Sequence, residues 1–100
     1  DLPQTPVQVA ATAPVVDGAD NVITATLANT GAVAALNTKL TLVNEKGERI
    51  LPAFYSDNYV ALLPGESRTI TIRYPATIKA QPHLTLRGWN VAAQEVAARD

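Results

Sequence analysis

The clearest strand pattern in the sequence is Leu36-Asn37-Thr38-Lys39-Leu40-Thr41-Leu42-Val43. Successive side chains of a strand point to opposite faces, so the three leucines and Thr38 share one face, and the other residues, Val43 included, face away. The stretch ends at Asn44-Glu45-Lys46-Gly47, which is typical of a tight turn. The pattern therefore predicts a half-buried strand over 36–43.

The same alternation recurs along most of the chain. It appears over 7–13, 23–27, 60–63, 69–74 and 84–87. A short apolar stretch, Ile50-Leu51, runs into Pro52, which predicts an edge strand or a strand that switches sheets. Turn signals recur about every 8–12 residues, the spacing of an immunoglobulin-like sandwich. We therefore predict an all-β fold, an immunoglobulin-like β-sandwich of about seven antiparallel strands in two sheets. Its outer faces are expected to carry a set of threonines: Thr24, Thr26, Thr41, Thr69 and Thr71.

The length of 100 residues predicts a single domain over 1–100. Pro3 and Pro6 make residues 1–6 resemble a linker. Only residues 92–99, which are rich in alanine and include Glu95, are compatible with a helix, and because this stretch is too short to be stable alone we expect a frayed tail over 92–100. The chain starts at Asp1 without a signal segment, so we expect it to be a domain excised from a longer polypeptide.

Composition excludes several classes of function. The chain has no cysteine, which removes a disulfide framework, a cysteine-based zinc site and a thiol nucleophile. Its formal net charge of -1 gives no electrostatic footprint for nucleic acid or an anionic membrane surface. The single histidine, His83, cannot form a histidine-based metal site alone, and Asp17 and Asp20 fit turn caps better than a calcium loop. We therefore expect no catalytic residue, no metal and no cofactor.

One segment stands out, Phe54-Tyr55-Ser56-Asp57-Asn58-Tyr59, which holds three of the five aromatic residues. Aromatic rings beside Asp and Asn can stack on a sugar and hydrogen-bond its hydroxyls. Alternatively, Phe54 and one tyrosine fill the core, and Ser56, Asp57 and Asn58 form a turn in which Asp57 accepts backbone amides. The residues alone favour this second interpretation.

The only tryptophan, Trp89, follows the last predicted strand. Alternation from Leu84 and Leu86 places Trp89 on the outer face with Arg87, and an exposed tryptophan beside an arginine is the composition of an interface anchor. A bulge at Gly88 would instead rotate Trp89 into the core. The sequence leaves both alternatives open.

Two motifs carry a family resemblance. Residues 50–67, centred on Tyr55-Ser56-Asp57-Asn58-Tyr59, and the ending Gly88-Trp89-Asn90 resemble a C-terminal immunoglobulin-like domain of glycoside hydrolase family 2 enzymes. The likeness is greatest to the branch of exo-β-D-glucosaminidases and β-mannosidase-like enzymes and covers about residues 22–91.

The resemblance implies a non-catalytic accessory domain of a secreted or periplasmic retaining glycosidase. The catalytic glutamates would lie in a separate barrel, and this domain would pack on that barrel and on other domains of the parent chain. The loop Tyr55, Ser56, Asp57, Asn58 and Tyr59 would lie near the mouth of the active site and contact the oligosaccharide substrate. Two other interpretations remain: an independent carbohydrate-binding module, and a spacer or adhesion domain.

Overall fold

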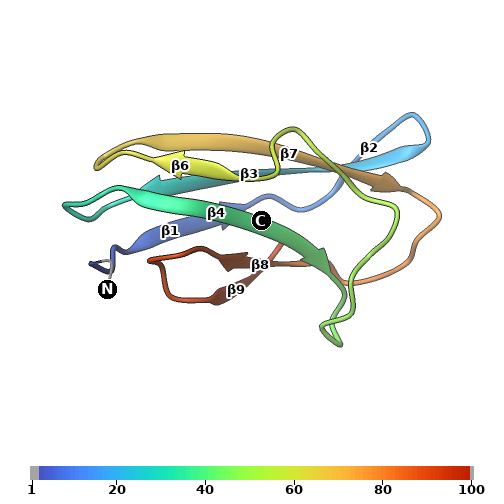
Figure 1. Ribbon diagram of the computed structural model, residues 1–100. Coiled ribbons are helices and arrows are strands. Elements are labelled where there is room, and N and C mark those ends of the chain that lie inside the picture. The colour runs from blue at the N-terminus through green and yellow to red at the C-terminus, as the bar shows by residue number, and fades with distance from the viewer. Residues whose placement is uncertain (1–2, 100) are drawn as a thin grey trace.

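The protein is a sandwich of two antiparallel sheets in a computed structural model that describes residues 3–99 (Figure 1). One sheet has the order β1-β3-β7-β5, with β2 also paired to β3. Its strands are β1 (Val7–Ala11), β2 (Val15–Asp17), β3 (Asp20–Asn29), β5 (Phe54–Tyr55) and β7 (Ser67–Pro75). The other sheet has the order β6-β4-β8-β9, formed by β4 (Ala35–Val43), β6 (Val60–Leu62), β8 (His83–Arg87) and β9 (Gln94–Ala97). The predicted all-β sandwich is confirmed, with nine strands in the described part of the chain.

The core lies between the sheets and follows the alternation in the sequence. In β3 and β7, cross-strand partners such as Ile23 and Ile72 are fully buried, because alternate side chains of both strands point inward. The opposing sheet contributes Leu40, Leu42, Leu84 and Leu86. Of the threonines expected outside, three are exposed and two are half-buried: Thr26, Thr69 and Thr71, then Thr24 and Thr41.

The C-terminal stretch whose sequence is compatible with a helix contains a strand instead. Residues Gln94–Ala97 form β9, which pairs with β8 from His83↔Ala97 to Leu86↔Gln94. The Gln94 side chain also donates a hydrogen bond of 2.7 Å to the carbonyl of Val7 in the other sheet. Helix propensity is a weak preference that tertiary context overrides, and here the open edge of β8 supplies backbone partners that a single helical turn lacks.

The prediction for 36–43 is correct in its centre and wrong at both ends. Thr38, Leu40 and Leu42 are buried as expected. The register with β6 shifts between Ala35 and Thr38, where Asn37 has a φ of 53°, so Ala35 rather than Leu36 enters the core. Val43, expected outside, is 4% exposed, because the chain turns back there and forms a bridge from Val43 to Arg49.

The segment after β4 connects the two sheets (Figure 1). Ile50 joins the core and its N–H donates to the Leu42 carbonyl at 3.0 Å, so Ile50-Leu51 is not a strand. The chain then pairs as β5 with β7 of the opposite sheet and returns as β6 beside β4. Residues 54–59 therefore run from the β5 edge of one sheet to the β6 edge of the other.

Two buried asparagines fix one end of the sandwich. Asn29 is 1% exposed; its side chain donates to the carbonyls of Val33 (2.8 Å) and Leu62 (3.0 Å) and accepts from the Thr5 hydroxyl (2.8 Å). Asn90, 2% exposed, accepts from the N–H of Leu36 at 2.9 Å. A buried amide is stable only when its hydrogen bonds are made, so these side chains hold the loops around them in one arrangement.

Candidate functional site

The aromatic segment 54–59 divides between the core and the surface. Tyr55 packs against the core, as predicted for one tyrosine, and its hydroxyl accepts a hydrogen bond of 2.8 Å from the N–H of Leu42. This bond joins the sheets where β4 extends past the end of β6. Phe54 is 68% exposed, so the expectation that it fills the core is wrong. Successive side chains of a strand point to opposite faces, so Phe54 points outward because Tyr55 points inward.

The polar centre of the segment forms a turn fixed to β7. The Ser56 N–H donates to the Thr71 carbonyl at 2.9 Å, and the Ser56 hydroxyl accepts from the Thr71 N–H at 3.0 Å. The Asp57 carboxylate lies 4.0 Å from the guanidinium of Arg68, whereas the sequence suggested backbone amides as its partners. Asn58 is exposed at the tip of the turn. Ser56, Asp57 and Asn58 thus lie on the surface, while Tyr55 faces away from them.

Tyr59 belongs to a different surface, the outer face of the β6-β4-β8-β9 sheet. Its side chain is 59% exposed, and the Lys39 ammonium lies 5.3 Å from the centre of its ring, within the range of a cation–π interaction. Trp89 is 68% exposed, which agrees with the outward alternative. The backbone N–H of Trp89 donates to the Leu36 carbonyl at 3.0 Å.

Tyr59, Arg87 and Trp89 line one open hollow of about 350 Å³ together with Asn37, Lys39 and Gly88. At Gly88 a Cβ would lie 2.6 Å from the side chain of Val91, so the chain between Arg87 and Trp89 lies too close to Val91 for a larger residue. The structure therefore joins one member of the predicted sugar-binding loop to both predicted interface residues. We call the four large side chains Lys39, Tyr59, Arg87 and Trp89 the Trp89 face.

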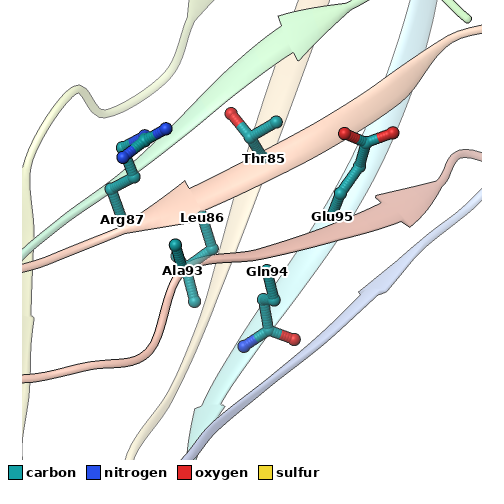
Figure 2. A pocket seen from close by; sticks show the side chains of 6 residues that line it. All are labelled: Thr85, Leu86, Arg87, Ala93, Gln94 and Glu95. Carbon is teal, nitrogen blue, oxygen red and sulfur yellow. The ribbon is translucent and has the colours of Figure 1, made fainter. Parts of the chain in front are cut away.

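A second hollow, of about 280 Å³, adjoins the first at Arg87 and lies over β8 and β9. Figure 2 shows Thr85, Arg87 and Glu95 pointing to one side of this strand pair and Gln94 pointing to the other. Glu95 is 3.3 Å from Nδ1 of His83, so the acid nearest to the lone histidine comes from the neighbouring strand. Sequence spacing could not reveal this pair, because the two residues meet only through strand pairing.

Sequence reasoning missed Lys39 as a site residue. Lys39 and Arg87 are directly opposite each other in the β4–β8 ladder. The sequence alternation did place Lys39 on the outer face. Only the strand pairing, however, shows that the second cation, Arg87, lies across from Lys39. No carboxylate lies within 4.0 Å of either cation among residues 3–99.

Two titratable groups have altered environments, and both lie away from the Trp89 face. Burial raises the pKa of the Tyr74 hydroxyl above its ordinary value. A hydrogen bond from the Gln81 N–H, 2.9 Å from the carboxylate, lowers the pKa of Glu45. Within the part of the chain that the structure covers, no three potential metal ligands cluster, and no helix is long and apolar enough to cross a membrane. The exposed aromatic and cationic side chains of the Trp89 face are suited to recognition through stacking and charge.

Comparison with known proteins agrees with the fold and gives it a family. Residues 1–91 match the sequence model of the exo-β-D-glucosaminidase Ig-fold domain. The chain is 41% identical over 98 residues to an exo-β-D-glucosaminidase of Streptomyces avermitilis, covering 92% of this chain and 11% of that protein. It is 46% identical over 46 residues to a mannosylglycoprotein endo-β-mannosidase of Lilium longiflorum, covering 46% of this chain and 5% of that protein.

A solved structure gives the same result. The chain superposes on the crystal structure of the Amycolatopsis orientalis exo-chitosanase CsxA with a TM-score of 0.90 and 31% identity, over 97% of this chain and 12% of that one. The chain thus spans only about a tenth of the relatives it matches. With sequence and fold in agreement over nearly its whole length, the chain belongs to the exo-β-D-glucosaminidase Ig-fold domain family.

Proposed function

We propose that this chain is a non-catalytic accessory domain at the C-terminal end of a longer family 2 glycoside hydrolase, where it packs on the catalytic barrel. The observation that carries the proposal is the match of nearly the whole chain to about one-eighth of an exo-chitosanase. A domain that aligns with so small a part of a glycosidase leaves most of that protein to house the catalytic machinery.

The test compares the complete polypeptide with the 100-residue chain. Both are assayed for release of glucosamine from chitosan oligosaccharides and of mannose from β-mannosides. We expect activity in the complete polypeptide alone. Hydrolysis by the 100-residue chain itself, or an absence of glycosidase activity in the complete polypeptide, would contradict the proposal.

We further propose that the turn after β5 helps shape the substrate cleft. Asp57 and Asn58 are both exposed there, and a carboxylate and an amide are suitable partners for sugar hydroxyls. Tyr55 takes no direct part in this arrangement, because its hydroxyl is used by Leu42. Asn58→Ala in the complete polypeptide is expected to raise KM with little effect on kcat. Thr26→Ala, a change at another exposed position, on β3, is the control; equal KM values for the two variants would refute the cleft role.

One observation favours a second candidate, an independent carbohydrate-binding module: Tyr59 and Trp89 are exposed in one hollow. Aromatic platforms of this kind stack on sugar rings. Calorimetric titration of the 100-residue chain with chitosan and mannan oligosaccharides separates the two functions, since an accessory domain is expected to give no heat of binding. Binding that is lost in Trp89→Ala would establish the module instead.

The site of action is also part of the proposal. A secreted or periplasmic location of the parent enzyme fits the polymeric substrates named for its relatives, which cannot cross a membrane intact. Activity measured in culture medium, periplasmic extract and cytosol tests this location, and activity confined to the cytosol would contradict it.

A further inference from the structure

We infer that the Trp89 face is the docking surface of this domain and that its partner is an acidic surface in the remainder of the same polypeptide. This inference rests on the proposed accessory function and specifies which face makes the contact. The two outer faces of the sandwich differ in their charges, and that difference identifies the docking side.

On the outer face of the β1-β3-β7-β5 sheet, the charges are already neutralised. Arg73 lies 2.9 Å from the Asp17 carboxylate and 3.7 Å from that of Asp20. Arg73 lies in the middle of this face, because it is the cross-strand partner of both Val22 and Phe54. A partner arriving here would have to break or desolvate an existing ion pair, which is unfavourable.

The Trp89 face has the opposite property. Lys39 and Arg87 are register partners on neighbouring strands, and like charges directly opposite each other are destabilising. Lys39 leans over the Tyr59 ring, and neither cation has a carboxylate within 4.0 Å in the described chain. The repulsion is relieved when an anionic group lies between or above the two cations, so this face is complementary to negative charge.

The accompanying side chains fit a protein partner. Trp, Tyr and Arg are the residues most enriched at the energetic centres of protein interfaces. Here Tyr59, Arg87 and Trp89 line a single hollow, with a second hollow adjoining it at Arg87. The relatives are about ten times longer than this chain, so a large surface of the same polypeptide is available to cover the face.

The same charges disfavour an amino sugar as occupant. A protonated glucosamine carries an ammonium group, and it would meet two cations in the centre of the hollow. An acidic sugar would match the charge of the two cations. The tyrosine, arginine and tryptophan in the hollow are nevertheless the residue types most enriched in protein interfaces, and this favours a protein surface of the same polypeptide as the occupant.

The test uses hydroxyl-radical footprinting of the complete polypeptide. Trp89 and Phe54 have the same exposure here, 68%, on opposite sheets, so Phe54 is an internal control. The oxidation rate of each residue is divided by its rate in a proteolytic digest of the same polypeptide, which gives a protection factor. We expect the protection factor of Trp89 to exceed that of Phe54 at least about fivefold, because a docked anchor is fully desolvated. Equal protection of the two residues would overturn the inference. Thermal unfolding then shows whether the proposed function also fails: if this domain unfolds in one transition together with the rest of the polypeptide, the proposed packing still stands.

A charge-reversed pair tests the acidic partner. Lys39→Glu with Arg87→Glu is compared with Lys46→Glu and Lys79→Glu, which change the net charge equally at exposed positions elsewhere. Circular dichroism confirms that both variants are folded. We expect Trp89 to become reactive in the first variant only. Continued protection of Trp89 in the first variant would overturn the acidic partner, and so would protection that appears only on adding oligogalacturonate.

Discussion

The hydroxyl of Tyr55 gives the most direct test of how the two sheets are held together. β4 extends beyond its last pair with β6, Thr38↔Val60, to Leu42, a fully buried residue whose N–H has no strand partner there. Its partner is the Tyr55 hydroxyl at 2.8 Å, and its carbonyl accepts from the Ile50 N–H. Tyr55→Phe keeps the ring and removes only the acceptor.

The expected loss can be worked out from that geometry. A buried donor left without a partner costs about 1–3 kcal/mol. For a domain of this size, each kcal/mol shifts Tm by about 4–8 °C. A central value of about 2 kcal/mol therefore lowers Tm by about 8–16 °C. The ring contacts remain, so we expect no change in the all-β circular dichroism spectrum.

The assay is thermal and urea unfolding of the 100-residue chain, with Tyr59→Phe as the matched control. Tyr59 is 59% exposed, and loss of its hydroxyl is expected to change stability by less than about 0.5 kcal/mol. Hydrogen exchange gives a local readout, because the Leu42 amide should lose protection in Tyr55→Phe alone. If the two variants have the same Tm, or if Leu42 stays protected, the hydrogen bond does not hold the sheets and the reasoning is refuted.

Three further changes test other parts of the fold. Asn29→Ala removes partners from Thr5, Val33 and Leu62 and should cost about 3 kcal/mol or more by urea unfolding, whereas the exposed Asn58→Ala should be nearly neutral. Gly88→Ala places a Cβ 2.6 Å from Val91 and should cost about 1–3 kcal/mol by overpacking; an unchanged Tm would show that the loop yields freely. Because burial raises the pKa of Tyr74, the unfolded chain releases that proton first, so stability should fall as pH rises above about 10. The fall should be smaller in Tyr74→Phe, and parallel pH profiles for the two proteins would contradict this assignment.

The strands that the sequence predicted best are those with one face in the core. In β7 the buried residues Ile70, Ile72 and Tyr74 alternate with exposed ones over 69–74. A one-residue slip would move that entire set to the solvent, so the pattern itself specifies the register. The alternation also predicted the centre of β4 correctly, but it failed at Leu36. A β-bulge at Asn37, where φ is positive, adds one residue to the ladder, and the apolar pattern of the sequence does not reveal it.

The errors near the C-terminus and in the aromatic segment have a different cause. The alanine-rich composition of 92–99 favours a helix, but what decides its structure is the edge of β8 forming the β9 ladder. For residues 54–59, the sequence shows that aromatic rings are present and not which sheet each one meets. Tyr55 and Tyr59 are four residues apart, yet one bonds to β4 from inside the sandwich and the other lies under Lys39 on the outside.

That separation changes how the candidate site should be understood. The sequence treats 54–59 as one sugar-binding loop and Arg87 with Trp89 as a separate interface. In the folded chain Tyr59 leaves the first group and joins the second, because β6 and β8 flank β4 on either side. Asp57 and Asn58 remain at the exposed turn beside it. The polar turn and the cationic aromatic surface therefore adjoin where Asn58 meets Tyr59. If the Trp89 face docks as proposed, that contact would also fix the position of the turn relative to the barrel.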